Sequence, residues 1–366
     1  MNKCKILFVL HMPPPVHGAA MVGQYIHDSE LINSEFDCHY INLATASGLE
    51  DIGKFKFKKI VSFWNLLRRI RKSIRDLNPN LVYITPNANG GPFYKDFVAV
   101  LLLKTMGCKV IAHYHNKGVA SRQNRVVDNF LYQRFFKGLK VILLSERLYP
   151  DIQKYVRRED VYVCPNGIPR DMKPRERILH DIPRILFLSN LLIEKGVLVL
   201  LDALKIIKDN GYSFVCDFVG SETTEIDANR MDEEIRKRNL QDAVLYHGKR
   251  YGAEKDMFLN DTDIFVFSTF YQNECFPLVL LEAMQHELPI ITTNEGGISD
   301  IVKDGENGFI CEKRNPIDLA DKITCLLNDE QLRTKMGHDG NIKFKEKFTL
   351  EVFENRMVEI LQSVVE

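Results

Sequence analysis

Two glutamates eight positions apart stand where a ligand could reach both. Glu274 follows an apolar run, residues 264–267, at the point where a buried strand would end. Glu282 falls inside a second apolar run that begins at Pro277, a residue suited to the first position of a helix. A carboxylate inside an apolar helix is costly unless something bonds to it. One acid on a loop and one on a helix can therefore contact two parts of a single polar ligand.

Two further stretches could contribute to a site. His11 to Ala20 follows the first apolar run, and its small residues, with Gly18 among them, let backbone N–H groups at a helix start approach an anion. The stretch lacks the G-x-G-x-x-G pattern, which disfavours a nicotinamide cofactor, and a plain helix start remains the alternative. His113 and His115 share one face at the end of another strand, but a third metal ligand is not evident nearby.

An Asp-x-Asp pair at Asp261 and Asp263 has the form of a metal-binding motif. It precedes the strand at 264–268, at the end of the sheet away from the expected ligand. We therefore interpret it as a loop feature and predict no metal site.

These residues need a framework of parallel strands. Short apolar runs alternate with helical patterns along the whole chain, which is typical of βα units. The expected strands are 6–10, 81–85, 109–113, 141–145 and 161–164 in the first half, and 185–189, 214–219, 244–247, 264–268 and 289–293 in the second. We predict a first domain at 1–169, a linker at 170–183 and a second domain at 184–348. A last helix at about 349–366 could pack back on the first domain.

The two predicted domains also differ in charge, with a change of sign near residue 170. Residues 1–170 hold 25 lysines and arginines against 13 aspartates and glutamates, whereas the remaining residues hold 24 against 36. The segment from Lys54 to Arg75 carries nine basic residues, no acidic ones, and several aromatic residues such as Trp64. Such a segment can bind an anionic membrane or be a solvated face, and we expect no nucleic-acid partner because a recognised nucleic-acid module is lacking. The eight scattered cysteines and the short apolar runs favour a cytoplasmic protein.

The run from Glu274 to Met284 resembles the E-x7-E signature of retaining glycosyltransferases of family four, of the bacterial surface-polysaccharide type. The match is close over nine residues, and weaker matches occur at Gly18, His115 and residues 165–168. The resemblance implies the GT-B architecture, with two Rossmann-like doubly wound parallel-sheet domains and a cleft between them. It also implies that the second domain binds the nucleotide-sugar donor and the first binds the acceptor.

Roles for individual residues follow from the resemblance. Glu282 would bond the ribose hydroxyls, Glu274 the sugar hydroxyls, and Lys195 the diphosphate. Backbone N–H groups near Phe276 and Leu278 would hold the sugar, and His115 would approach it. Gly18 would contact the donor, and so would Asn190, which stands where the family has an arginine.

We therefore expect a metal-independent, retaining glycosyltransferase without a cofactor. Its donor would be a UDP- or GDP-sugar, and its acceptor a hydroxyl of a glycan or of a lipid-linked sugar. Two alternatives stay open: a non-hydrolysing nucleotide-sugar epimerase, and a non-catalytic partner subunit that keeps the same fold. Incubation with nucleotide sugars would separate the three: a transferase would slowly release UDP or GDP, an epimerase would interconvert sugars, and a partner subunit would do neither.

Overall fold

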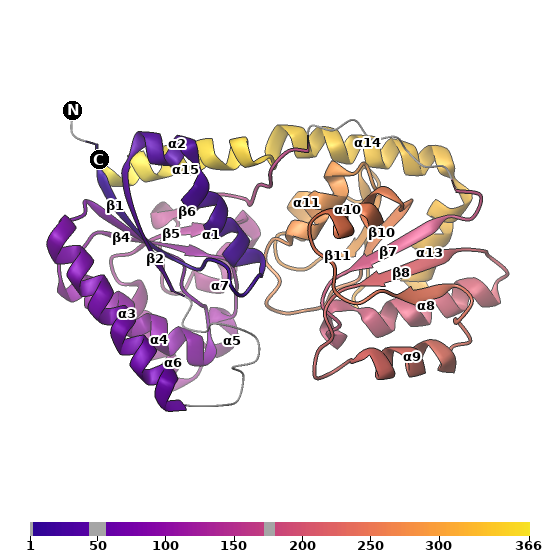
Figure 1. The fold of residues 1–366 in the computed structure, drawn as a ribbon, viewed down its shortest axis with the longest axis horizontal. Coiled ribbons are helices and arrows are strands. Elements are labelled where there is room, and N and C mark those ends of the chain that lie inside the picture. Colours follow the sequence, from indigo (N-terminus) through magenta and orange to yellow (C-terminus); the bar gives the residue numbers. More distant parts are fainter. Residues whose placement is uncertain (1–2, 44–55, 172–179) are drawn as a thin grey trace. The chain divides into compact units, whose positions relative to one another are not determined.

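The chain forms two compact α/β units, each built on a six-stranded sheet (Figure 1). The computed structural model describes residues 3–43, 56–171 and 180–366. The first unit contains Met1–Gly167 together with Leu350–Glu366, and the second contains Ile168–Thr349. Most of the predicted linker, residues 172–179, lies outside the described residues.

The sheet of the first unit is parallel throughout, with the strand order β2-β1-β3-β4-β5-β6. Its strands are β1 (Lys5–Leu10), β2 (Asp37–Asn42), β3 (Leu81–Ile84), β4 (Val110–Tyr114), β5 (Lys140–Leu143) and β6 (Val161–Val163). The order reverses beside β1, so the loops after β1 and β3 leave the sheet at its topological switch point.

Eight α-helices of the first unit are described. They are α1 (Gly18–Asp28), α2 (Glu30–Glu35), α3 (Lys56–Leu77), α4 (Gly90–Thr105), α5 (Val119–Arg122), α6 (Val126–Phe136), α7 (Tyr149–Ile152) and α15 (Leu350–Val365). Helix α15 is the last element of the chain, yet it packs against α2. In Figure 1 the yellow α15 lies beside the indigo α2.

The sheet of the second unit is also parallel, with the order β12-β11-β10-β7-β8-β9. Its strands are β7 (Arg184–Leu188), β8 (Val215–Val219), β9 (Val244–Tyr246), β10 (Ile264–Phe267), β11 (Ile290–Thr293) and β12 (Gly308–Cys311). The order reverses between β7 and β10. Ligands of open α/β sheets bind outside the carboxyl ends of the strands at such a reversal.

The described α-helices of the second unit flank this sheet. They are α8 (Val197–Asp209), α9 (Ala228–Lys237), α10 (Ala253–Asn260), α11 (Leu278–Gln285), α12 (Ile298–Ile301), α13 (Pro316–Asn328) and α14 (Glu330–Lys347). Helix α11 carries Glu282 and is held from its far end by α14. The Asn341 side chain donates to the carbonyls of Met284, at 3.2 Å, and Gln285, at 3.0 Å. This satisfies carbonyls that a helix end leaves unpaired.

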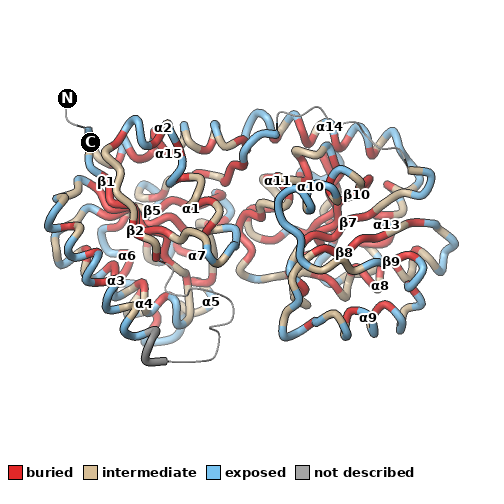
Figure 2. The backbone as a smooth tube through the Cα atoms, viewed as in Figure 1, coloured by how far each residue is buried: buried red, intermediate tan, exposed pale blue. Residues whose placement is uncertain are grey.

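The predicted α/β class with two doubly wound parallel sheets is confirmed. In Figure 2 the central strands of both sheets are buried, as continuous apolar runs require. Sequence reasoning missed β2 and β12, which are the edge strands beyond β1 and β11. Pro277 caps α11, which begins one residue later than predicted.

Gly337 lets α14 approach the end of α11. A Cβ added there would lie 1.9 Å from the backbone oxygen of Glu287, whereas a Cβ at Gly340 in the same helix would meet its nearest atom at 3.7 Å. We expect Gly337→Ala to lower the free energy of unfolding by about 1–3 kcal/mol, because the helix must move. Gly340→Ala should leave it unchanged or raise it by up to about 1 kcal/mol. Urea unfolding of both variants checks this, and equal effects would contradict the close approach.

Candidate active site

The loop after β7 and the segment after β10 are joined at the switch point of the second unit. The Phe270 N–H donates to the Glu194 carbonyl at 2.8 Å, and the Ser268 hydroxyl donates to the Gly196 carbonyl at 3.2 Å. Gly196 has φ +90°, and a Cβ on it would lie 2.2 Å from the Ser268 carbonyl oxygen. Only glycine fits there without strain. We call these joined segments, residues 189–196 and 268–276, the seam.

Lys195 and Glu274 meet across the seam. Lys195 ends a short 3-10 turn, Ile193–Lys195, that precedes α8. Its Nζ is bonded to the Glu274 carboxylate, and the exposed fractions of the two side chains are 15% and 10%. The ammonium also lies 4.6 Å from the centre of the Tyr271 ring, a favourable position for a cation. The chain thus holds a largely buried ion pair whose two charges neutralise each other.

The glycine turn after β11 fixes the backbone at Glu274. The Gly297 N–H donates to the Cys275 carbonyl at 2.6 Å. Gly296 has φ +56°, and a Cβ on it would lie 2.3 Å from the Glu274 carbonyl oxygen. Phe276 is buried, with its ring centre 5.6 Å from that of Phe348. Three loops at the carboxyl ends of β7, β10 and β11 therefore support the same short stretch.

Glu282 lies in α11, whose first residue is Leu278. Its Oε1 accepts a hydrogen bond from Lys255 Nζ of α10 at 2.7 Å. Its Oε2 is buried and has no hydrogen-bond partner among the described residues. Burial raises the pKa of Glu282, and the Lys255 ammonium acts in the opposite direction. The sequence pattern gave no sign of Lys255, which comes from an element outside the motif.

Asn190 follows β7 and is exposed, with its carbonyl accepting from the Leu192 N–H at 2.8 Å. A second cation approaches the seam from the loop after β12, because the Arg314 guanidinium lies 4.4 Å from the centre of the Phe270 ring. Beside it, Lys313 pairs with Glu295. Sequence reasoning missed both cations because it missed β12, the strand that delivers them.

The predicted site residues of the first unit surround its own switch point. Gly18 starts α1, and a Cβ on it would meet nothing within 4 Å, so the backbone there is open to a ligand. His17 caps this helix, with Nδ1 accepting from the Ala20 N–H at 3.2 Å.

His113 is buried in β4, and the half-buried His115 follows that strand with its ring tilted against the ring of His113. His113 Nδ1 lies 2.7 Å from the Tyr83 hydroxyl, and the rings of His113 and His115 are 4.3 Å apart. The Nε2 atom of His115 is buried without a partner among the described residues. Burial lowers the pKa of His115 to about 3, so its ring is neutral near pH 7 and could accept or donate one hydrogen bond.

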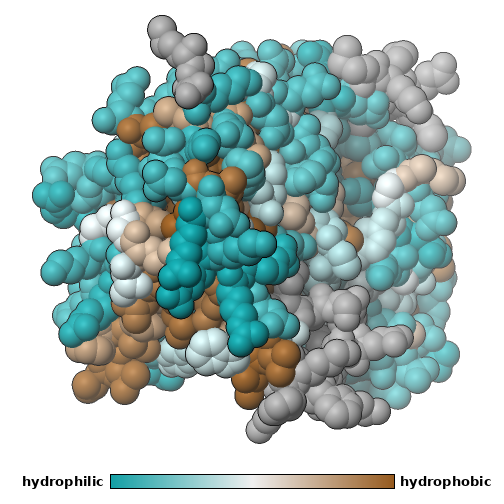
Figure 3. All heavy atoms as spheres, turned by 60° about the vertical axis from the view of Figure 1, so that its left-hand side comes forward, coloured by the Kyte–Doolittle hydropathy of each residue, from teal (hydrophilic) through white to brown (hydrophobic). Residues whose placement is uncertain are grey.

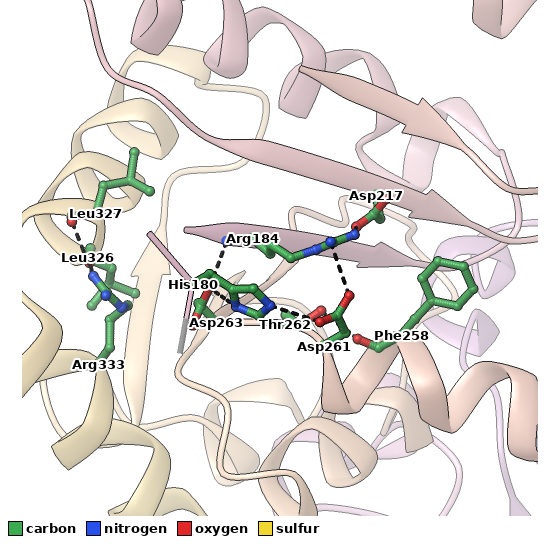
Figure 4. A network of polar contacts seen from close by, with 10 residues as sticks. All are labelled: His180, Arg184, Asp217, Phe258, Asp261, Thr262, Asp263, Leu326, Leu327 and Arg333. Atoms are coloured by element: carbon green, nitrogen blue, oxygen red, sulfur yellow. Dashed lines mark hydrogen bonds and ion pairs between the residues drawn. The ribbon is translucent and has the colours of Figure 1, made fainter. Parts of the chain in front are cut away.

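The Asp-x-Asp pair binds side chains of its own unit (Figure 4). His180 lies between the two carboxylates, with Nε2 2.8 Å from Asp261 and Nδ1 3.0 Å from Asp263. The Arg184 N–H also donates to Asp263, at 2.8 Å, at the start of β7. Within residues 3–43, 56–171 and 180–366, no group of three or more His, Cys, Asp or Glu residues is arranged to hold a metal ion. The pair thus anchors the chain that enters β7.

The second unit therefore brings together most of the predicted donor residues. Lys195 contacts Glu274, and Phe276, Leu278 and Glu282 continue along the same stretch into α11. Gly18 and His115 belong to the other unit.

Residues 170–342 match the family of glycosyl transferases group 1. A capsular polysaccharide biosynthesis glycosyltransferase of Staphylococcus aureus, CapM, is 34% identical over 48% of this chain and 45% of its own length. This chain thus spans less than half of that relative. An uncharacterized glycosyltransferase of Methanocaldococcus jannaschii is 27% identical over 71% of this chain and 70% of its own length.

Solved structures share the fold of the whole chain. A glycosyltransferase from Rickettsia africae superimposes with a TM-score of 0.75 at 20% identity and covers 100% of both chains. The Anabaena protein HepE, solved in complex with UDP-glucose, gives a TM-score of 0.72 at 17% identity, covering 98% of this chain and 99% of its own. The second unit is therefore a glycosyl transferases group 1 domain, and the predicted resemblance and GT-B fold class are confirmed.

Burial of His115 has a consequence for stability at low pH. Its folded-state pKa lies below the unfolded value, so the unfolded chain binds more protons and stability is lost as pH falls from about 6.5 toward the folded-state pKa of about 3. We expect His115→Asn to lose less stability in this range, by up to roughly 1.4 kcal/mol for each pH unit. Urea unfolding between pH 6.5 and 4.5 measures it.

The matched control for that experiment is His338→Asn, which changes an exposed histidine in α14. Identical pH dependence in wild type and His115→Asn would show that the unfolded and folded chains protonate His115 alike.

Proposed function

We propose that this chain is a retaining glycosyltransferase that moves a sugar from a UDP- or GDP-sugar to a hydroxyl group of a glycan or of a lipid-linked acceptor. The bond between the sugar and the diphosphate breaks, and a new bond forms from the same sugar carbon to the acceptor oxygen. The acceptor proton passes to the departing phosphate. Metal and cofactor are not required, because fixed cations and backbone N–H groups neutralise the leaving group.

The unpartnered oxygen of Glu282 carries this proposal. A buried carboxylate oxygen without a partner is costly, and the cost is removed when a ligand hydroxyl donates to it. Lys255 already holds the other oxygen, which orients the carboxylate for that hydroxyl. A ribose offers two adjacent hydroxyls, which suits the single carboxylate of Glu282 in α11.

The diphosphate and the sugar of the donor then bind along the seam. The diphosphate takes Lys195 as its cation, with Asn190 contributing a polar contact instead of a charge. A sugar hydroxyl donates to Glu274, which is released as Lys195 turns to the phosphate. Backbone N–H groups near Phe276 and Leu278 hold the sugar, whereas Pro277 cannot donate.

The relatives support the substrate class. HepE was solved with UDP-glucose, which fits a nucleotide-sugar donor, and CapM is named for capsular polysaccharide biosynthesis, which fits a surface-polysaccharide acceptor. We place the reaction in the cytoplasm, at the inner face of an anionic membrane contacted through the basic segment that contains α3.

An assay with candidate donors tests the proposal against its alternatives. A transferase slowly releases UDP or GDP from the correct nucleotide sugar even when water is the acceptor. An epimerase would interconvert two nucleotide sugars instead. A partner subunit without activity would do neither. This alternative is tested because Asn190 stands where the family has an arginine.

The separate roles of the two glutamates predict unequal effects on nucleotide binding. We expect Glu282→Ala to weaken binding of free UDP or GDP by about 1.5–3 kcal/mol, because a charged hydrogen bond to ribose is lost. Glu274→Ala should bind the nucleotide at least as well as wild type, because it frees Lys195 for the diphosphate. Calorimetric titration of both variants measures this, and equal losses would contradict the assignment.

Lys195 should matter for turnover more than for folding. We expect Lys195→Ala to lower the rate of sugar transfer about 10²–10³-fold, the usual cost of removing one charge-stabilising group. Lys205→Ala is the control, because Lys205 is a surface lysine that pairs with Asp209. Unchanged turnover in Lys195→Ala, or wild-type turnover abolished by EDTA, would mean that another cation neutralises the leaving group.

A further inference from the structure

Three helices of the first unit present apolar side chains outward. On α6 these are Val126, Val127 and Phe130, with exposed fractions of 85%, 66% and 50%. Tyr94, Val98 and Leu101 form a stripe on α4, and Ile60, Val61 and Trp64 form one on α3. Val98 lies four residues from Tyr94 and three from Leu101, while Phe130 and Trp64 each lie three and four residues from the adjacent pair before them, so each set lies on one face. We call these nine residues the apolar rim.

The helices of the rim lie side by side. Helix α4 packs between α3 and α6. The Tyr94 hydroxyl donates to Asp128 of α6 at 2.6 Å, and at the other end of α4 the Lys104 ammonium donates to the Arg134 and Lys137 carbonyls at 2.8 Å each. The three stripes therefore belong to one continuous surface.

The rim lies toward the functional end of its sheet. Helices α3, α4 and α6 lead into the amino ends of β3, β4 and β5, so their first turns lie near the carboxyl ends of the parallel strands. The rim residues occupy the first three turns or so of each helix. The same carboxyl ends carry Gly18 and His115, which follow β1 and end β4.

Cations follow the rim along the same helices. On α3 the outward face continues from Trp64 into exposed basic residues: Arg68, Arg69, Arg71, Lys72 and Arg75. On α6 it continues into Arg134, whose guanidinium lies 4.6 Å from the centre of the Phe130 ring. Of the three acidic residues in these helices, Asp96 and Asp128 are buried, which leaves Asp76 exposed. The surface is thus apolar at one end and strongly basic at the other.

We propose that this surface docks on an anionic lipid bilayer, with the apolar rim inserted and the arginines at the headgroups. Figure 3 shows hydrophobic side chains gathered at the lower edge of the molecule, where α3, α4 and α6 lie, with strongly hydrophilic ones above them. Apolar insertion next to basic charge is the arrangement by which proteins bind anionic interfaces. Among the described helices, none is long and apolar enough to cross a membrane.

Docking in this way brings the carboxyl ends of the first sheet to the depth of the lipid headgroups. This part of the proposal rests on the proposed function, because only a glycosyltransferase would need an acceptor there. An acceptor sugar carried on a lipid phosphate would meet Gly18 and His115 without leaving the membrane. The proposal extends the predicted basic segment, residues 54–75, to two further helices. Residues 54 and 55 of that segment lie outside the described residues.

Vesicle binding tests the surface directly. Wild type and a Val126→Ser/Val127→Ser/Phe130→Ser variant are sedimented at low salt with vesicles of phosphatidylcholine alone or with about a third of phosphatidylglycerol. We expect wild type to bind the anionic vesicles, and the triple variant to bind at least roughly tenfold more weakly, since it lacks three of the apolar side chains that would insert. Arg68→Glu/Arg71→Glu/Arg75→Glu should also bind weakly, and added salt should weaken wild type.

The control variant is Met257→Ser/Ile317→Ser, which removes two side chains of the second unit that are 69% and 64% exposed. It should bind vesicles as wild type does. Wild type that stays in solution with anionic vesicles would overturn the proposal, and so would a triple variant that matches the control. A wild-type dimer, broken by the triple variant and indifferent to vesicles, would assign the surface to a second copy of the chain.

Release of UDP or GDP from a donor, measured without vesicles, keeps the two proposals apart. If the membrane proposal is wrong but the proposed function is right, all variants release nucleotide and the vesicles bind none of them. If the function fails, nucleotide is not released by any of them, and vesicle binding is judged on its own.

Discussion

The candidate site depends on the hydrogen bonds that join the loop after β7 to the segment after β10. These two strands are neighbours where the strand order reverses, so both segments leave the sheet at the same place. Gly196 packs on the Ser268 carbonyl with no room for a side chain, and the Phe270 N–H bonds the Glu194 carbonyl. With the backbones fixed in this way, Lys195 and Glu274 must meet. The glycine turn after β11 then holds the other side of Glu274.

The charges at this site are balanced, but they are not all satisfied. Lys195 and Glu274 neutralise each other across the seam, and Lys255 neutralises Glu282. Yet one oxygen of Glu282 stays buried without a partner among the described residues. Packing alone gives no reason to keep such an atom, because an apolar residue would avoid the cost. A ligand hydroxyl gives a reason, and the ion pair at Lys195 can open when an anion competes for the lysine.

Sequence reasoning predicted the features that depend on short-range patterns, namely the central strands and the stretch from Glu274 to Glu282. The central strands are continuous apolar runs because both faces of a parallel sheet are covered, and the stretch from Glu274 to Glu282 is local in sequence. Edge strands have one neighbour, and β2 is partly exposed and mixed in composition, so it shows no such run. Missing β12 also hid Arg314, and Lys255 was missed because it contacts Glu282 from 27 positions away. Contacts between distant segments leave no periodic signal.

The crystal structure of a complex with UDP or GDP tests the central claim most directly. The account predicts a ribose hydroxyl within hydrogen-bond distance of the Glu282 oxygen that now has no partner, and the diphosphate at Lys195, which would have turned away from Glu274. A nucleotide bound elsewhere on the second unit, with Glu282 Oε2 still unpartnered and the pair of Lys195 and Glu274 intact, would contradict it.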